Sequence, residues 1–148
     1  MSEKIYKLEI VTPEKKAFSE DVVFSVFPGS EGELGILAGH AMLLARLNPG
    51  EIRITRPGSA TVLHLAIAGG FLEVRNNQVS VLAETAETAA EIDRAEAQKA
   101  VTEAEEARKL AATPADRAAA DVQLRIAIAR LKVAGSAPGA PASTTKPA

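Results

Sequence analysis

The chain has 148 residues, of which 47% are hydrophobic but only 3% aromatic, and its formal net charge is −2 from 17 basic and 19 acidic residues. This balance argues against a general nucleic-acid-binding protein, which normally carries a basic excess. The lack of cysteine excludes disulfides, thiol catalysis and cysteine metal sites. No run of about 18 apolar residues is present, and the N-terminus lacks the apolar stretch of a signal peptide. We therefore expect a soluble intracellular protein of one or two small domains.

Residues 1–86 have the pattern of an antiparallel β domain. Tyr6, Leu8 and Ile10 fall on one face of IYKLEIV, and Ile52 and Ile54 fall on one face of EIRITR, as in strands with one solvent-facing side. We expect the alternate positions to face solvent: Lys7, Glu9, Glu51, Arg53 and Thr55. Turn signals separate the apolar runs at Pro49-Gly50, Pro57-Gly58 and Asn76-Asn77, and the last predicts a two-residue hairpin turn. Many short strands at this spacing predict a β-sandwich or flattened barrel, with core phenylalanines at 18, 24, 27 and 71.

Residues 87–134 have the pattern of an α-helical hairpin. Thr88 and Glu91 fit a capping box, which predicts a helix from there to about Ala111. Thr113 and Pro114 fit the N-cap and first turn of a second helix that ends near Ala134. The short connection predicts an antiparallel pair.

The apolar stripes expected on these two helices are narrow. They comprise Ile92, Ala95, Val101, Ala104, Ala107 and Leu110 on the first helix, and Val122, Ile126, Ala129 and Val133 on the second. Alanine buries little apolar area, so the hairpin should be held weakly and could detach at a cost of a few kcal/mol, using roughly 25 cal/mol per Å². Residues 135–148, rich in Gly, Pro, Ser and Ala, are predicted to be a disordered tail.

No motif in the chain predicts catalysis or metal binding. His40 and His64 have no carboxylates at ligand spacing. The glycines of GSEGELG are not followed by the Lys-Ser/Thr of a phosphate loop, and corners of a β-fold explain them better. The second helix carries Arg117, Arg125, Arg130 and Lys132, which form either a solvated face or a surface for an acidic partner. These observations favour a non-catalytic interaction protein of a larger assembly.

Three segments together resemble the epsilon subunit of the bacterial F-type ATP synthase: GELGILAGHAMLLARLNPGEIRI, AIAGGFLEVRNNQVSVLAE and EIDRAEAQKA. The resemblance covers about residues 4–134. It implies a β-sandwich followed by a helical hairpin, in a non-catalytic subunit at the foot of the central rotor stalk. Its implied partners are the gamma subunit and the c-ring, which place it peripherally at the cytoplasmic side of the cell membrane. The implied role is to couple proton-driven c-ring rotation to ATP synthesis.

The resemblance also implies which residues make these contacts. The segment around Glu31 to His40 faces the c-ring in relatives, which predicts c-ring and gamma contacts at Glu31, Gly32, Glu33, Gly39 and His40. In relatives the hairpin can also extend toward the alpha and beta subunits and restrain ATP hydrolysis. The cations available for the acidic segment of the beta subunit are Arg117, Arg125, Arg130 and Lys132.

The start of the first helix departs from the nucleotide-binding pattern Ile/Leu-Asp-x-x-Arg-Ala of some members. Ile92 and Asp93 match it, whereas Glu96 occupies the arginine position. A carboxylate beside a triphosphate repels it, so we expect no cofactor and weak or absent ATP binding. Ala38 and Met42 stand where many members have proline. The alternatives left open by the sequence are an ATP-sensing regulatory protein that acts through the hairpin and, as a fold-level possibility, a minor enzyme.

Overall fold

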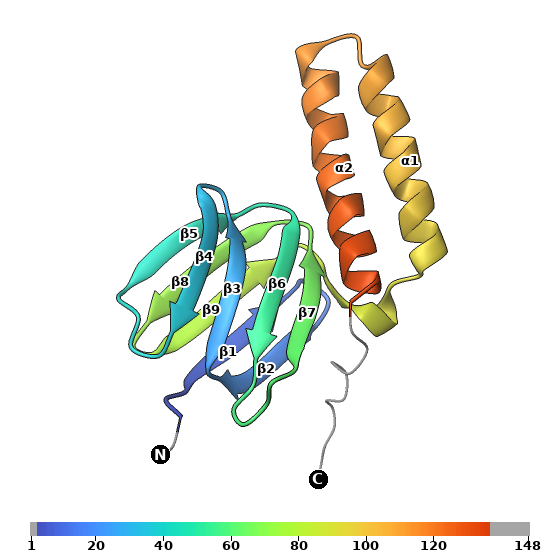
Figure 1. The fold of residues 1–148 in the computed structure, drawn as a ribbon. Helices are drawn as coiled ribbons and strands as arrows, with labels where there is room; N and C mark the ends of the chain where they lie inside the picture. The colour runs from blue at the N-terminus through green and yellow to red at the C-terminus, as the bar shows by residue number, and fades with distance from the viewer. Residues whose placement is uncertain (1–2, 137–148) are drawn as a thin grey trace.

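The computed structural model describes residues 3–136 of the chain. Ten strands come first, followed by a 3₁₀ turn and two helices (Figure 1). The strands are β1 (Tyr6–Val11), β2 (Lys16–Val22), β3 (Phe24–Gly29), β4 (Gly32–Leu37), β5 (Leu43–Leu47), β6 (Gly50–Thr55), β7 (Val62–Ile67), β8 (Gly70–Arg75), β9 (Gln78–Ala83) and β10 (Ala86–Thr88). The helices are α1 (Arg94–Leu110) and α2 (Pro114–Ala134). The predicted order of a β domain and then a helical hairpin is confirmed. Residues 137–148, which make up nearly all of the predicted disordered tail, lie outside the described residues.

The strands form a nearly closed β-sandwich. One layer has the order β10-β7-β6-β3-β4 and the other β5-β8-β9-β1-β2, and a single pair, Gly29 with Leu47, joins β3 to β5. β1 pairs with β9 in parallel, with Lys7 opposite Gln78, whereas the other ladders among the described strands are antiparallel. The first strand of the chain is thus held by one of the last strands of the sandwich.

The core between the layers is largely aliphatic, as the composition predicts. Tyr6, Leu8 and Ile10 point inward together, which confirms the predicted face of β1. The Tyr6 hydroxyl contacts the hydroxyl of buried Ser25 and donates a hydrogen bond to the carbonyl of Ile36. Polar groups inside the sandwich are therefore paired with one another, as buried polar groups require.

Two of the four phenylalanines are not core residues. Phe18 and Phe27 are buried, but Phe24 is 38% and Phe71 55% exposed, so the prediction for the latter two was wrong. Each alternates with a neighbour that takes the inward position: Ser25 beside Phe24, and Leu72 beside Phe71. The period of two in a strand then sends the aromatic ring to the outer face.

The turn predicted at Asn76-Asn77 is confirmed. Both residues have positive φ, 52° and 59°, and they connect β8 to β9 with Arg75 opposite Gln78. This is the geometry of a type I′ hairpin, whose twist matches that of the flanking strands.

The first helix begins later than predicted. Thr88 and Glu91 do form a capping box, but it caps a 3₁₀ turn over Ala89–Glu91. Ile92 is extended after this turn, and α1 starts beyond Asp93, whose carboxylate accepts a hydrogen bond from the Glu96 N–H. The predicted domain boundary between residues 86 and 87 falls inside β10, which pairs with β7.

The predicted start of α2 is confirmed, because the Thr113 hydroxyl accepts a hydrogen bond from the Asp116 N–H with Pro114 in the first turn. The buried stripes differ in part from the predicted ones, because Ala97, Ala120 and Ala127 are also buried. The predicted stripe positions that are buried are Ile92, Val101, Ala104, Ala129 and Val133, and Ile126 is half-buried. The predicted positions that are exposed are Ala95, Ala107, Leu110 and Val122. Figure 1 shows why: the closed end of the hairpin projects beyond the sandwich, and only part of α2 lies against it.

Candidate functional site

The residues predicted to contact the rotor are all exposed, but they form two groups. Glu31, Gly32 and Glu33 lie at the turn between β3 and β4, whereas Gly39 and His40 follow the other end of β4. β4 has 6 residues, which separates the two groups by about 20 Å at roughly 3.3 Å per residue. The structure therefore does not bring the five residues into one cluster. It places them at the two ends of a strand that pairs on one side, with β3.

The loop after β4 is tied to the β8–β9 turn. The Gly39 N–H donates to the Asn77 side-chain oxygen at 2.8 Å, and the Asn77 amide donates to the Ile5 carbonyl at 2.9 Å. Leu37 and Met42 flank this loop in the sequence and are 60% and 74% exposed. Sequence reasoning did not include these two, although apolar residues beside a glycine turn are the signal that could have found them.

The outer face of the second layer carries an exposed apolar row that sequence reasoning also missed. Phe71 on β8 is opposite Leu82 on β9, and Leu82 is opposite Val11 on β1. Phe71 and Leu82 are 55% and 63% exposed, and the Arg46 guanidinium lies 5.7 Å from the Phe71 ring centroid. Exposed apolar residues that lie side by side in this way are a candidate surface for a protein–protein contact.

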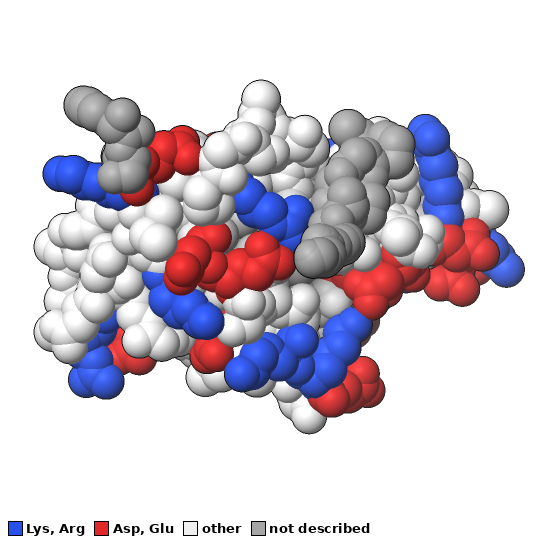
Figure 2. All heavy atoms as spheres, turned by 90° about the horizontal axis from the view of Figure 1, so that it is seen from below, with Lys and Arg blue, Asp and Glu red and all other residues white. Residues whose placement is uncertain are grey.

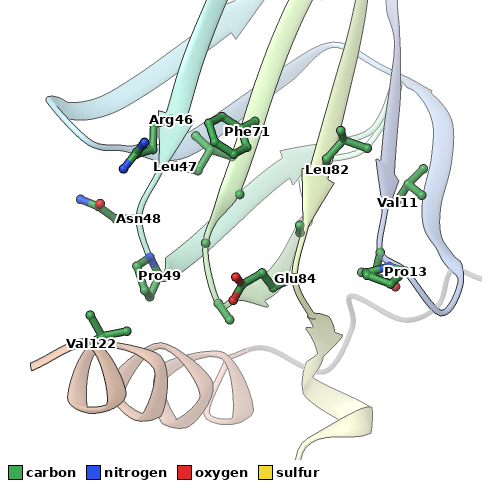
Figure 3. Close-up of a pocket in the computed structure, with 15 residues that line it drawn as sticks. Val11, Pro13, Arg46, Leu47, Asn48, Pro49, Phe71, Leu82, Glu84 and Val122 are labelled. Carbon is green, nitrogen blue, oxygen red and sulfur yellow. The ribbon is translucent and has the colours of Figure 1, made fainter. Parts of the chain in front are cut away.

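A groove of about 750 Å³ runs along this row to the hairpin. Figure 3 shows Phe71, Leu82 and Val11 on one side of it, and Val122 of α2 beside Pro49 at the other end. Glu84 also lines the groove. The groove therefore lies between the sheet face and α2.

The hairpin contacts the first layer of the sandwich through small apolar residues. Ala129 and Val133 of α2 cluster with Ala66 of β7, and with Ile92 and Ala97 near the start of α1. These residues bury little area, so the free energy that holds the hairpin down is small. The predicted weak seam is consistent with this packing.

Ion pairs surround this apolar contact. Arg130 donates from Nε to Glu87 at 2.8 Å and from Nη2 to the second oxygen of Glu87 at 3.3 Å, and it lies 3.6 Å from Glu96. Hydrogen bonding to Glu87 raises the pKa of Arg130. Lys132 Nζ lies 3.4 Å from an oxygen of Glu51.

Glu51 was expected to face solvent, and this prediction was wrong: it is 8% exposed. His64 Nδ1 lies 2.5 Å from one of its oxygens and Arg53 3.5 Å from the other. Arg53 also donates to both oxygens of Glu33, at 3.0 and 3.3 Å, and this contact lowers the pKa of Glu33. The alternation in EIRITR is real, but α2 lies against the outer face of β6, where Lys132 reaches Glu51, so the Glu51 carboxylate is paired and buried.

The four cations predicted to act in inhibition occupy two different environments. Arg130 and Lys132 are paired with residues of the sandwich, as above. Arg117 and Arg125 are exposed, and neither side chain has an ion-pair partner within residues 3–136. On the face seen in Figure 2, basic and acidic side chains lie interleaved, next to one another.

The two residues that match the nucleotide-binding pattern have structural roles here. The Ile92 side chain is buried in the cluster beneath α2, and the Asp93 carboxylate caps α1. Glu96, in the arginine position, faces Arg130. The Arg130 guanidinium, the kind of group that an anionic ligand needs, is thus already paired with Glu87 and Glu96.

Comparison with known proteins agrees with this architecture. Residues 5–89 match the family model "ATP synthase, Delta/Epsilon chain, beta-sandwich domain". The ATP synthase epsilon chain of Syntrophobacter fumaroxidans is 50% identical over 90% of this chain and 98% of the relative. The epsilon chain of Pelotomaculum thermopropionicum is 54% identical over 72% of this chain and 78% of the relative.

A solved structure is similar over most of the chain. A chain in the cryo-EM structure of the Euglena gracilis mitochondrial ATP synthase, OSCP/F1/c-ring in rotational state 1, gives a TM-score of 0.74 at 26% identity, covering 90% of this chain and 82% of that one. In residues 3–136, neither helix has the length and hydropathy of a membrane span. Sequence, family model and fold agree, and the chain belongs to the family of ATP synthase epsilon chains.

Proposed function

We propose that this chain is a non-catalytic rotor subunit of an F-type ATP synthase, which couples proton-driven c-ring rotation to ATP synthesis and restrains ATP hydrolysis. The observation that carries the proposal is the family membership together with an exposed apolar sheet face on the domain that defines the family. Its place in the cell is peripheral, at the cytoplasmic side of the cell membrane, held there by its partners.

The β-sandwich supplies the permanent attachment to the gamma subunit. Phe71 and Leu82 lie side by side on adjacent strands and expose apolar area to solvent. Burying such area stabilises a complex by roughly 25 cal/mol per Å², and aromatic anchors backed by a cation such as Arg46 are typical of binding hot spots. The row runs into the groove toward α2, so a partner seated on it would also meet the hairpin.

The c-ring contact uses the two ends of β4. Glu31 at one end offers a carboxylate beside the Glu33–Arg53 ion pair, and His40 at the other end lies in the sequence between the exposed apolar residues Leu37 and Met42. Because the two groups are about one strand length apart, they would touch separate loops of a ring rather than one. A contact of this width resists tilting of the sandwich when the ring turns.

The hairpin supplies the restraint on hydrolysis. In the compact arrangement Arg117 and Arg125 remain exposed and without ion-pair partners within residues 3–136. When the hairpin extends toward the alpha and beta subunits, Arg130 and Lys132 leave their docked partners and join these two cations in meeting an acidic segment, each exposed pair contributing about 0.2–1 kcal/mol. Several must therefore act together.

The attachment is tested by co-purification from a host that expresses this chain with its gamma subunit and c-ring. The double variant Phe71→Asp with Leu82→Asp, with folding checked by circular dichroism, should lose the complex. The matched control is Leu110→Asp, because Leu110 is 79% exposed on the hairpin. A wild-type chain that fails to join the complex would reject the proposed function, and a folded double variant that still joins would reject this face.

The restraint is tested in the assembled complex with Arg117→Ala and Arg125→Ala together. ATP hydrolysis should rise and ATP synthesis should stay nearly unchanged, because the sandwich still links the rotor to the c-ring. A hydrolysis rate equal to wild type would remove the inhibitory role of these cations.

A further inference from the structure

Arg130 lies between carboxylates from two other elements. Glu87 comes from β10 and Glu96 from α1, whereas Arg130 itself is on α2. The bidentate pair with Glu87 is the more sheltered of the two, with side-chain exposures of 22% for Arg130 and 29% for Glu87, against 67% for Glu96. A bidentate pair between an arginine and a carboxylate fixes orientation as well as distance. One guanidinium therefore fastens the hairpin to the sandwich and its two helices to each other.

Arg130 and Lys132 lie on either side of the apolar docking stripe of α2. Ala129 and Val133, four residues apart, fall on the same face of the helix and are buried against the sandwich. Positions 130 and 132 project to the two flanks of this face at 100° per residue. Arg130 reaches Glu87 on one flank, and Lys132 reaches buried Glu51 on the other.

The apolar part of the contact is too small to decide the position of the hairpin alone. Its buried members between α2 and the sheet are Ala66, Ala129 and Val133, and Leu131 and Ala134 of α2 are partly buried against the same cluster. A few methyl groups bury little area, so partly sheltered ion pairs of comparable strength set the balance between docked and released states. Of the two ion-pair groups, Arg130 with its carboxylates should hold the hairpin more strongly than the Lys132–Glu51 pair, because the Lys132 side chain is 65% exposed to solvent.

We infer that Arg130, paired with Glu87 and Glu96, is the latch of the docked hairpin, and that while docked it holds back the inhibition to which Arg125 contributes. Releasing the latch frees the hairpin and increases inhibition, whereas removing Arg125 weakens inhibition. Because two carboxylates neutralise the guanidinium, the latch closes without an anionic ligand. The inference rests on the proposed function, since inhibition by a released hairpin is part of it.

The latch is tested first in the isolated full-length chain. The sequence has no cysteine, so Gln78→Cys on the sandwich and Leu110→Cys at the end of α1 give two unique spin-label positions, both exposed. Dipolar spectroscopy then measures the ratio of released to docked hairpin. Arg130→Ala should raise this ratio about fivefold, which is the change for about 1 kcal/mol. Arg125→Ala is the matched control and should leave the ratio unchanged.

A double-mutant cycle separates an ionic latch from a general packing role. Glu87→Ala should raise the ratio as Arg130→Ala does, and the two together should do no more than either alone. The latch would be overturned if the effects of Arg130→Ala and Glu87→Ala on the released-to-docked ratio were additive. It would also be overturned if the Arg130→Ala chain, with native circular dichroism, had the same ratio as wild type. Arg130→Lys should restore only part of the docking, since it keeps the charge but loses the bidentate geometry.

The assembled ATP synthase supplies the second measurement. Glu87→Ala, which opens the latch and leaves the four cations of α2 in place, should lower the ATP hydrolysis rate, and Arg125→Ala should raise it. If the label distances respond but neither variant changes hydrolysis, the latch stands and the proposed restraint fails. If the distances do not respond, the latch is overturned whatever the hydrolysis rate.

Discussion

Lys15 Nζ lies 2.7 Å from an oxygen of Glu91, joining the loop between β1 and β2 to the 3₁₀ turn that precedes α1. The two residues are 76 positions apart in the chain. This pair fixes the linker to the sandwich up to Glu91. A hairpin that leaves the sandwich must therefore pivot after this point, near Ile92 and Asp93, where the backbone is extended.

The Lys15–Glu91 pair predicts a pH-dependent contribution to stability. Burial raises the pKa of Glu91, but hydrogen bonds from Lys15 and Thr88 outweigh it, so the pKa lies below the ordinary 4.5. A carboxyl with a lowered pKa stabilises the folded state above 4.5 and loses this contribution as the pH falls through its folded pKa. Lys15→Ala should cost at most about 1 kcal/mol at neutral pH, since the pair is exposed, and less in acid.

Urea unfolding at pH 7 and at several values below pH 4.5 measures this difference. Lys109→Ala, at an exposed position on α1, is the control and should differ little from wild type at any pH. A Lys15→Ala deficit that stays constant into acid would contradict the assignment to Glu91.

Val133 and Leu8 should respond differently to truncation, although both side chains are 0% exposed. Leu8→Ala opens a cavity in the sandwich core and should lower the global free energy of unfolding by about 2–5 kcal/mol. Val133→Ala removes two methyl groups from the docking contact, roughly 0.8 kcal/mol for each, and should loosen the hairpin first. Hydrogen exchange reports both: in the Val133 variant, faster exchange should be confined to residues 94–134. A uniform acceleration would show that hairpin and sandwich unfold as one unit.

Asn77 should support the loop that carries His40. Its side chain bridges the Gly39 N–H and the Ile5 carbonyl, and its own φ is 59°. Asn77→Gly removes the side-chain bridge but still adopts the left-handed backbone easily. Asn77→Ala removes the bridge and also disfavours the left-handed backbone. We expect a cost of about 1–2 kcal/mol for glycine and a further cost for alanine. Thermal unfolding of both variants measures the cost of losing the bridge and the added cost of placing alanine in the left-handed region. Equal Tm values for the two variants would show that the backbone conformation carries no strain.

ATP should bind to the isolated chain only at millimolar concentration, about −4 kcal/mol or less favourable. Arg130 is already neutralised by Glu87 and Glu96, so little positive charge is left for a triphosphate. Glu96→Arg should strengthen binding at least about tenfold, because it replaces repulsion with attraction. Calorimetry with magnesium-free ATP decides both points, and micromolar affinity of the wild-type chain would contradict the prediction. Glu106→Arg, also at an exposed position on α1, controls for added charge.

The sequence predicted most of the sandwich because its strands carry local signals. The alternation that buries Tyr6, Leu8 and Ile10, and the Asn76-Asn77 turn, depend only on near neighbours. The true start of α1 was missed for a local reason: two caps, Thr88 and Asp93, follow one another, and the first is used by a 3₁₀ turn.

The candidate site was less predictable, because its contacts are distant in sequence. Arg130 and Glu87 are 43 positions apart, and no period or motif connects them. Glu51 could be read only as an outward-facing residue of its strand, since the helix that covers it lies elsewhere in the chain. The resemblance supplied candidate cations, but the fold was needed to divide them into paired and exposed members.

The parallel pairing of β1 with β9 has a consequence for synthesis on the ribosome. β1 and β2 can pair as soon as they emerge, but the other edge of β1 finds its partner only when residues 78–82 have been made. Closure of the sandwich therefore waits for contacts of high sequence separation, which form slowly, while an unpaired strand edge is exposed to other chains. The helices emerge last and need only local contacts, so they settle on a finished surface. The nascent chain thus completes the β-sandwich before the helical hairpin docks on it.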